Sequence, residues 1–437
     1  MKKLLYPALA AMAIWASPSQ AATSPRELPL YAGKPLLSWH ITVADFEAQQ
    51  ALTGSSAAVP KPANPRVPDS RVEARRSGKK GKSDALTLQW QNAWYASLRV
   101  DGGKPLDLRP YLPGGTLEFD LKVVDMAKGG LTFTMSCGAD CTRKLPYILP
   151  SRDLAGKGWQ HLAFSMSCFA RDDDDFSAVT QPFTVDTSGT GEAAVANVKI
   201  VRNGKPNASC PDYKSESVTA APLAQVWALE WWIPRHEQKL QEIRKLKEAG
   251  QRAEIVFIGD SITHGWEDAG KSVWQQYYAK HNALDLGFGG DHTENVLWRL
   301  QHGEVDGIDP KVAVLMIGTN NTGDRQEDPR TTAAGIKRIV DELKQRLPNT
   351  KVLLLAIFPR DEQPSSPLRR LNERINAIIS GYADERSVFF LNINASLMNP
   401  DGTLSKDILP DLLHLSEKGY GLWAKSMDPM LQKLLAP

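Results

Sequence analysis

Two patterns of hydrophobic and polar positions divide the chain. From about Leu28 to Asp212, short apolar segments with alternating faces are punctuated by glycine, proline and aspartate. Such segments, without helical periodicity between them, are typical of antiparallel strands. We therefore predict a β-sandwich or jelly roll over residues 28–212. Its strand-like segments are DALTLQW, TLEFDLKVV, LTFTMSC, WQHLAFSMSCF, FTVDTSG and AVANVKIV.

The next residues, 213–253, are interpreted as a linker followed by a connecting helix. Pro234 suits the first turn of a helix and Gly250 suits its C-terminal stop. Trp231 and Trp232 precede the helix and are expected to anchor it on the following domain. The apolar positions at helical spacing are Ile233, Leu240, Ile243 and Leu246.

From Glu254 onwards, continuous apolar segments alternate with amphipathic ones. The apolar segments EIVFIG, ALDLG, KVAVLMIG, KVLLLAIF and SVFFLNI are predicted strands. The predicted helices between and after them span residues 294–301, 331–346, 369–382 and 416–434. This alternation predicts an α/β domain over residues 254–437, with a parallel sheet of five strands covered on both faces.

The first residues have the pattern of an exported protein. Lys2 and Lys3 precede an apolar stretch, and small residues follow up to Ala21. This indicates a signal peptide over residues 1–21 and a periplasmic or extracellular location. The alternative, a membrane anchor, is disfavoured because the stretch is too short to span a bilayer. We expect no stable membrane insertion.

Charge gives no reason to expect nucleic acid as a partner. The chain has 52 Lys and Arg against 50 Asp and Glu, and removing the signal peptide takes away two lysines, leaving 50 against 50.

Four cysteines in an exported chain suggest two disulfides. Cys137 and Cys141 are close enough to form a tight loop, which leaves Cys168 and Cys210 for the longer bridge. Metal ligation is the alternative, but no histidine lies nearby at a ligand spacing, so we expect no metal.

The segments WYASLRV, CGADC, SCFARDDDDFSAVTQPFTV and VANVKIV resemble the galactose-binding-like domain appended to some bacterial family-3 glycoside hydrolases. The resemblance implies an accessory domain in a carbohydrate-active protein. Trp90, Trp94 and Tyr95 are candidates for stacking on a sugar, although aromatics in alternating strands more often belong to the core. The acidic run 172–175 suggests a solvated loop rather than a calcium site, because its carboxylates are consecutive.

Polar residues follow the predicted strands of the C-terminal domain, where ligands bind in such sheets. Ser261 follows the first strand, Gly290 the second and Asn320 the third, while Asp411 and His414 follow the fifth. A serine nucleophile needs an imidazole to take its proton and a carboxylate to orient that imidazole. One helical turn would bring residues 411 and 414 to the same side.

An oxyanion also needs fixed donors, and the backbone N–H of Ser261, the N–H of Gly290 and the Asn320 amide are available. Taken singly, each residue has an ordinary structural role, such as a helix cap for Ser261 or a turn for Gly290. Their joint occurrence at successive strand ends favours a catalytic set.

The segments FIGDSIT, GFGGDHTENVLWRLQHGEVDGIDPKVAVLMIGTNN and DLLHLSEKGY resemble the GDSL or SGNH hydrolase family, in particular the branch similar to the catalytic subunits of platelet-activating-factor acetylhydrolase. This resemblance implies a flavodoxin-like α/β/α sandwich. It also implies Ser261 as nucleophile, His414 as base and acid, and Asp411 as its partner, with Gly290 and Asn320 in the oxyanion hole and no cofactor.

The leading hypothesis is therefore an exported esterase that removes O-acetyl groups from a carbohydrate. Trp266 and Trp298 lie near the motif glycines and are candidates for lining the pocket, with core packing as the alternative. A lipid or small-ester acyl hydrolase is the second hypothesis, and a non-catalytic sugar-binding protein is the third.

Overall fold

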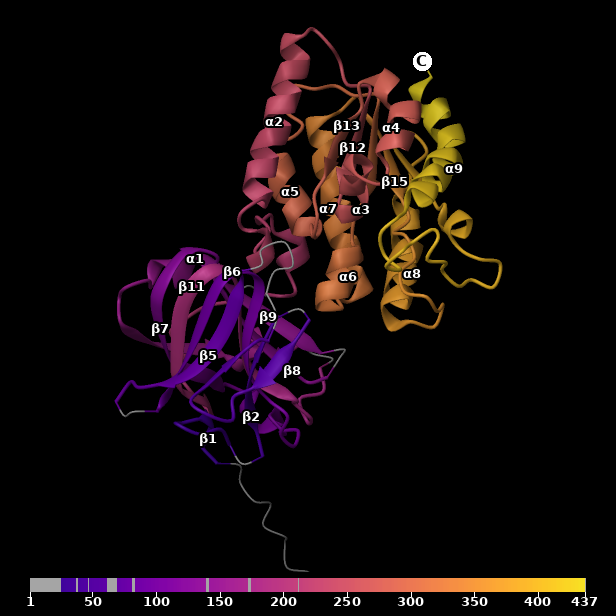
Figure 1. Cartoon of the computed structure of the whole chain (residues 1–437). Helices are drawn as coiled ribbons and strands as arrows, with labels where there is room; N and C mark the ends of the chain where they lie inside the picture. Colours follow the sequence, from indigo (N-terminus) through magenta and orange to yellow (C-terminus); the bar gives the residue numbers. More distant parts are fainter. Residues whose placement is uncertain are drawn as a thin grey trace, which may run out of the picture.

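The computed structural model describes residues 25–436, apart from residues 37, 46, 61–68, 81–82, 139–140, 172–173 and 211. A β-rich region and an α/β region are joined by a connecting segment (Figure 1). The predicted signal peptide lies outside the described residues. Among the helices that are described, none combines the length and apolar character that a membrane span needs.

The N-terminal region is built from antiparallel strands, as the alternating segments predict. Its strands are β1 (Glu27–Tyr31), β2 (His40–Ala44), β3 (Gln49–Ala51), β4 (Ser56–Ala58), β5 (Arg71–Ser77), β6 (Ala85–Asp101), β7 (Thr116–Lys128), β8 (Leu131–Ser136), β9 (Thr142–Tyr147), β10 (Trp159–Ser165) and β11 (Gln181–Val201), with one short helix, α1 (Ile148–Asp153). The long strands β6 and β11 pair along most of their length. Their ends take different partners: β6 pairs with β5 and β2, and β11 with β7 and β8.

The core of this region consists of the inward-facing residues of the alternating strands. Four phenylalanines form its centre, with ring centroids between 4.7 and 6.4 Å apart in the contacts among them. Rings of this size bury much apolar area, so this cluster stabilises the sandwich through the hydrophobic effect. The four are Phe119, Phe133, Phe164 and Phe183.

Both predicted disulfides are present. Cys137 pairs with Cys141, with Cα atoms 5.1 Å apart, and Cys168 pairs with Cys210, with Cα atoms 5.7 Å apart. The acidic run differs from the predicted solvated loop at Asp174, whose carboxylate forms a buried ion pair with Arg143. Burial of both partners is tolerated because each charge is neutralised and hydrogen-bonded by the other.

The connecting segment contains two short 3₁₀ turns, η3 (Glu216–Val218) and η4 (Val226–Ala228), followed by helix α2 (Trp232–Glu248). The predicted helix is confirmed, but it begins two residues earlier, at Trp232, whose ring is fully buried and anchors the helix. Ile233 does not belong to the packed face, since 39% of it is exposed.

The C-terminal region is a parallel sheet, in the order β13-β12-β14-β15-β16. Its strands are β12 (Ile255–Gly259), β13 (Leu284–Gly287), β14 (Val312–Met316), β15 (Lys351–Leu355) and β16 (Val388–Leu391). Its helices are α3 (Ser261–His264), α4 (Lys271–Tyr277), α5 (Thr293–Gln301), α6 (Thr319–Arg325), α7 (Pro329–Arg346), α8 (Pro367–Ile379) and α9 (Glu417–Leu435).

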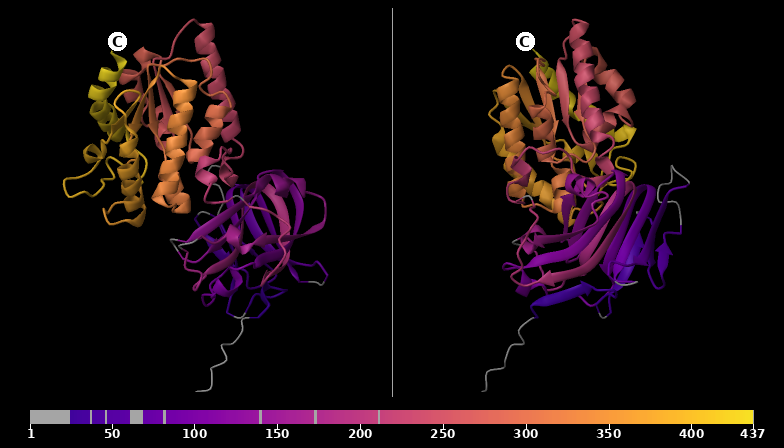
Figure 2. Two further views of the ribbon diagram at one scale, coloured as in Figure 1. Left: turned by 180° about the vertical axis from the view of Figure 1, so that it is seen from behind. Right: turned by 90° about the vertical axis from the view of Figure 1, so that its left-hand side faces the viewer.

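Helices cover both faces of this sheet, as the apolar strands predict (Figures 1 and 2). One core includes residues of α2, α5, α7 and α8, and the other includes residues of α4 and α9. Alternate residues of each strand enter the two cores: Ile255 and Phe257 on one side, Val256 and Ile258 on the other. The edge at which the strands end carries α3 and α6, and Figure 1 shows α6 extending from it towards the sandwich. The predicted fold class is confirmed for both regions.

Candidate active site

Ser261 lies at the corner between strand β12 and helix α3. The carboxylate of Asp260 caps the helix by accepting a hydrogen bond from the N–H of Ile262 at 3.0 Å. Gly259 is the last residue of the strand, and the position requires glycine because a Cβ atom there would collide with the side chain of Thr263 and the carbonyl of Met316. The corner therefore places the Ser261 hydroxyl at the carboxyl end of the sheet, where ligands bind in folds of this class.

Asp411 and His414 lie on the loop between β16 and α9. The predicted helical turn is wrong: the residues form a bend in which Leu412 has a φ of 63°. The Asp411 side chain stabilises the bend, since its Oδ1 accepts hydrogen bonds from the N–H groups of Leu413 at 3.0 Å and His414 at 2.7 Å. The carboxylate of Asp411 and the imidazole of His414 are still in contact, because the bend turns the chain back between these two residues.

The structure brings Ser261, His414 and Asp411 together in one chain of hydrogen bonds. Nε2 of His414 lies 2.8 Å from Oγ of Ser261, and Nδ1 lies 2.6 Å from Oδ2 of Asp411. Because an ionised carboxylate only accepts, Nδ1 carries the proton and Nε2 is left to accept from the serine hydroxyl. Burial acts to raise the pKa of Asp411, but its hydrogen bonds with His414 hold that pKa below its usual value.

The triad opens to solvent. The side chains of His414 and Asp411 are 43% and 56% exposed, and Ser261 is partly exposed. The three side chains are therefore within reach of an ester that approaches from solvent.

Gly290 and Asn320 lie at the ends of the two strands that flank β12. Gly290 has a φ of 78°, a conformation that favours glycine. The Asn320 amide donates one hydrogen bond to the carbonyl of Asp291 at 2.9 Å, which fixes the side chain and leaves its second N–H available. Among the described residues, the backbone N–H groups of Ser261 and Gly290 donate to no other protein group. The three predicted donors therefore follow the ends of the adjacent strands β12, β13 and β14, and their role in an oxyanion hole stays a prediction.

A buried ion network holds the loop that carries Gly290. Arg299 is fully buried and bridges the carboxylates of Asp291, at 2.8 Å, and Glu304, and its guanidinium lies 3.9 Å from the centroid of the Phe288 ring. Trp232 donates its indole N–H to Asp291 at 2.6 Å. Each charge in the network has a partner, which makes the conformation of the loop stiff rather than adaptable.

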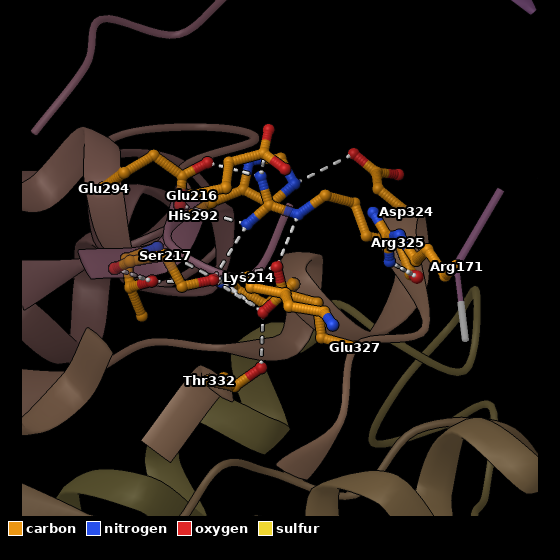
Figure 3. A network of polar contacts seen from close by, with 12 residues as sticks. Arg171, Lys214, Glu216, Ser217, His292, Glu294, Asp324, Arg325, Glu327 and Thr332 are labelled. Carbon is orange, nitrogen blue, oxygen red and sulfur yellow. Dashed lines mark hydrogen bonds and ion pairs between the residues drawn. The ribbon is translucent and has the colours of Figure 1, made fainter. Parts of the chain in front are cut away.

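A second network supports the helix that contains Asn320 (Figure 3). The carbonyl of Arg325, the last residue of α6, accepts hydrogen bonds from Arg143 and Arg171 of the sandwich. Its guanidinium forms ion pairs with three acidic residues, one from the connecting segment and two from the C-terminal region. These are Glu216, Glu294 and Glu327. The sandwich is thus attached directly to an element of the candidate oxyanion hole.

The two tryptophans predicted to line the pocket do not face the triad. Trp266 is 1% exposed and packs in the core between Tyr420, Trp423 and neighbouring rings, so it does not contact a substrate. Trp298 is partly buried against Trp232, and its ring stacks on that of His302 at 3.8 Å. Both side chains lie near a motif glycine in sequence, but the helix geometry directs them into packed clusters.

The aromatic residues predicted on the sandwich also differ in their surroundings. Trp90 is fully buried and donates its N–H to the carbonyl of Ser188, which is a core role. The Tyr95 hydroxyl donates a hydrogen bond to Asp186 at 2.6 Å. Trp94 differs from Trp90 in burial, since 44% of it is exposed.

Sequence reasoning missed Trp227, which lies beside Gly290. A Cβ atom added at Gly290 would lie 2.7 Å from Cζ2 of Trp227, so the indole packs directly against this glycine. The available signal is the aromatic-rich segment VWALEWW, residues 226–232, in which the sequence predicts a role for Trp231 and Trp232 only.

Asp260 gives a prediction about stability and pH. Burial raises its pKa to about 6 from 3.8, although the N–H of Ile262 and the positive charges of His414, His292 and Arg360 act in the opposite direction. The folded state therefore binds this proton more tightly than the unfolded state. Between the two pKa values the unfolded carboxyl ionises first, so the free energy of unfolding falls as the pH rises, and it levels off above the folded pKa.

We expect the free energy of unfolding of the wild type, relative to Asp260→Asn, to fall by about 2 kcal/mol between pH 4 and pH 7. Urea unfolding of both proteins at several pH values measures this difference. The asparagine retains an oxygen for the N–H of Ile262, so only the titration is removed. A difference that does not change with pH would contradict an elevated pKa at this residue.

Comparison with known proteins identifies relatives of both regions. A family model described as the GDSL-like Lipase/Acylhydrolase family matches residues 257–422, and one described as Galactose-binding domain-like matches residues 39–200. The chain is 37% identical over 216 residues to the platelet-activating factor acetylhydrolase IB subunit alpha1 of Pongo abelii, which covers 49% of this chain and 89% of the relative. It is 31% identical to the subunit alpha2 of Rattus norvegicus, over 47% of this chain and 85% of the relative. An exo-1,3/1,4-beta-glucanase from a Pseudoalteromonas species is similar over 44% of this chain and 22% of that chain, at 18% identity and a TM-score of 0.35.

Proposed function

The chain belongs to the GDSL-like lipase/acylhydrolase family and is a serine esterase, and we propose that it removes O-acetyl groups from a carbohydrate. The proposal has two parts, the chemistry at Ser261 and the identity of the ester. The contact of 2.8 Å between Nε2 of His414 and Oγ of Ser261 carries the first part. The sandwich matched by a galactose-binding-like model, attached to the helix of Asn320, supports the second.

In the proposed mechanism, Oγ of Ser261 attacks the acetyl carbonyl carbon while its proton passes to Nε2 of His414. The tetrahedral intermediate collapses when its bond to the sugar oxygen breaks, and the imidazolium returns the proton to that oxygen. A water molecule then attacks the acetyl-serine, again losing its proton to Nε2, and acetate leaves as Ser261 is regenerated. Asp411 holds the imidazole in one tautomer and stabilises its positive charge in both steps.

The negative charge that forms on the carbonyl oxygen is assigned to three donors. These are the backbone N–H groups of Ser261 and Gly290 and the free N–H of the Asn320 amide. Fixed donors of this kind cost no reorganisation during the reaction, and removing one typically lowers turnover by about 10²–10³-fold. The two ion networks that hold Asp291 and Arg325 support this assignment, because they restrict the elements that carry two of the donors.

An acetyl group is the acyl part that the observations favour. The open triad suits a short acyl group on a bulky alcohol. The relatives with more than 30% identity are named acetylhydrolases, which supports the same acyl group. The bulky alcohol is proposed to be a sugar rather than a lipid because of the accessory sandwich, which a galactose-binding-like model matches.

The direct test is to incubate the purified protein with a panel of acetylated glycans and measure the acetate released. Ser261→Ala serves as the control for contaminating esterases. Release that depends on Ser261 from at least one glycan is the expected result. Hydrolysis of simple acetate esters without release from any glycan would remove the carbohydrate part of the proposal and leave the esterase.

The second candidate function, lipid or small-ester hydrolysis, predicts a different dependence on acyl length. An open site gives a long chain no apolar surface to bury, so we expect octanoyl esters to be poorer substrates than acetyl esters. Measuring kcat/KM for 4-nitrophenyl acetate and 4-nitrophenyl octanoate checks this. Preference for octanoate would favour the lipid hydrolase and contradict an acetylesterase.

We propose that the protein is exported. The pattern of residues 1–21 and the two disulfides support export, because disulfides persist in oxidising compartments. Sequencing the N-terminus of the protein recovered from the periplasm or medium tests this, with cleavage near Ala21 as the expected result.

A further inference from the structure

The connecting segment places two tryptophans beside the candidate oxyanion loop. Trp227, in η4, packs against Gly290, as the lack of room for a Cβ atom at that glycine shows. Trp231 lies beside the neighbouring Gly289, where an added Cβ atom would be 3.3 Å from Cη2 of its ring. The two indoles are roughly stacked, with centroids 5.8 Å apart and ring planes inclined by 29°. They form one aromatic surface that begins at a proposed oxyanion donor.

Both indoles are only partly buried, whereas the neighbouring Trp232 is fully buried. Trp90 and Trp232 are buried and donate their N–H groups to Ser188 and Asp291. Within the described part of the chain, Trp227 and Trp231 donate their indole N–H groups to no other protein group. A buried indole usually finds such a partner inside the protein, whereas a partly exposed one is free to donate to a ligand.

The surface is held in place from both regions of the chain. The carbonyl of Val226 accepts a hydrogen bond from the hydroxyl of Ser188, in strand β11 of the sandwich, at 2.6 Å. Val226 and Ala228, which flank Trp227, are buried. On the other side, Gln225 donates to the carboxylate of Asp324, in α6, at 3.5 Å. A partly exposed aromatic ring held this firmly is preorganised for binding, because little freedom remains to be lost.

A sugar ring fits the chemistry of this surface. A pyranose presents a face of C–H groups that packs on an aromatic ring, and its hydroxyl groups accept hydrogen bonds from donors at the ring edge. An ester bound with its carbonyl oxygen at Gly290 carries its alcohol part only a few atoms away. The alcohol part therefore reaches the indole surface without any rearrangement of the loop.

We propose that Trp227, with Trp231 beside it, is the surface on which the sugar ring that carries the acetyl ester stacks. This inference rests on the proposed function and adds to it: these residues determine specificity for a pyranosyl ester over a simple ester. It also gives the sandwich a role in catalysis by the neighbouring region, since Ser188 anchors the turn that presents Trp227.

The test compares two acetyl esters that differ only in the alcohol. The probes are β-D-glucose pentaacetate, which offers an acetyl group at every ring position that carries a hydroxyl, and ethyl acetate, which has no ring. For Trp227→Ala we expect kcat/KM on the pentaacetate to fall by about tenfold or more, through a higher KM. The fall on ethyl acetate is expected to be much smaller, and Trp227→Phe, which keeps a ring but lacks the indole N–H, should recover part of the loss.

Trp159→Ala is the matched control. Trp159 lies on β10, at the edge of the sandwich, and its ring is covered by Lys79 at 5.5 Å. We expect this variant to hydrolyse both esters at the wild-type rate. Thermal unfolding of all variants shows whether any loss follows from instability.

The outcomes separate this inference from the proposed function. Equal losses on both esters would mean that Trp227 only supports the loop of Gly290, and no loss on the pentaacetate would mean that the ring does not contact the sugar. Either result overturns the inference while hydrolysis of the pentaacetate by the wild type upholds the proposed function. A wild type that hydrolyses ethyl acetate but not the pentaacetate would overturn the proposed function and the inference together.

Discussion

Replacing Ser261 with alanine should lower kcat for acetyl ester hydrolysis by about 10⁶-fold, the effect that removal of a triad nucleophile has in serine hydrolases. The reason is that, among the described residues, Ser261 supplies the hydroxyl that is hydrogen-bonded to Nε2 of His414, at 2.8 Å. Steady-state hydrolysis of 4-nitrophenyl acetate, with enzyme at high concentration to capture residual activity, measures the loss. Ser261 begins α3 and is partly exposed, so the alanine variant should fold with near wild-type stability.

A double variant makes this prediction more specific. If Ser261 and His414 act as one unit, Ser261→Ala combined with His414→Ala should lose no more than Ser261→Ala alone, because the histidine has nothing left to activate. Additive losses would mean that the two residues contribute independently. Retention of substantial activity in the single variant, with the protein shown to be folded, would contradict the assignment of Ser261 as nucleophile.

Asp411→Asn is expected to lower kcat by about 10⁴-fold, the size of effect seen when a triad aspartate becomes an amide. The hydrogen bonds that Asp411 makes within the bend explain this loss. Oδ1 of Asp411 accepts hydrogen bonds from the N–H groups of Leu413 and His414, so an asparagine oxygen is held at that position. The asparagine NH₂ group then faces Nδ1 of His414, which must become an acceptor. The proton moves to Nε2, and the imidazole is unable to take the proton of Ser261.

Asp401→Asn provides the matched control for this variant. Asp401 lies on the same long loop after β16, is exposed, and likewise accepts a hydrogen bond from a backbone N–H two residues later, that of Thr403 at 2.9 Å. We expect this control to keep wild-type activity and to lose a similar, small amount of stability. An equal fall in activity for both variants would show that the loop, rather than the tautomer of His414, is responsible.

The arrangement of the site could be predicted from the sequence to the level of strand ends. Ser261, Gly290 and Asn320 follow buried strands, and parallel strands end at one edge of a sheet, so their proximity follows from topology alone. The bend at Asp411 could not be predicted, because a spacing of three residues fits a helical turn as well as a capped bend. Leu412 adopts a φ of 63°, which is unusual for leucine and depends on its surroundings.

The tryptophans show most clearly which contacts could not be predicted from the sequence. Trp266 and Trp227 are both near motif elements, one in sequence and the other in space. Trp266 follows the nucleophile by a few residues, yet its ring enters the core with Tyr420 and Trp423. Trp227 is far from Gly290 in sequence and packs directly against it. Nothing in the local pattern distinguishes the two, since each is the central residue of a three-residue 3₁₀ turn.

The amino-acid order by itself determined the two architectures, the confirmed disulfide pairs and the strand ends at which polar residues gather. These follow from periodicity and turn chemistry, which act over a few residues. Only the tertiary structure decided that Asp174 is buried with Arg143, that Trp227 rather than Trp266 flanks the proposed oxyanion donor, and that the sandwich supports the helix of Asn320. The physical reason is that burial and partner choice depend on surfaces contributed by segments distant in sequence, and these surfaces exist only once the chain has packed.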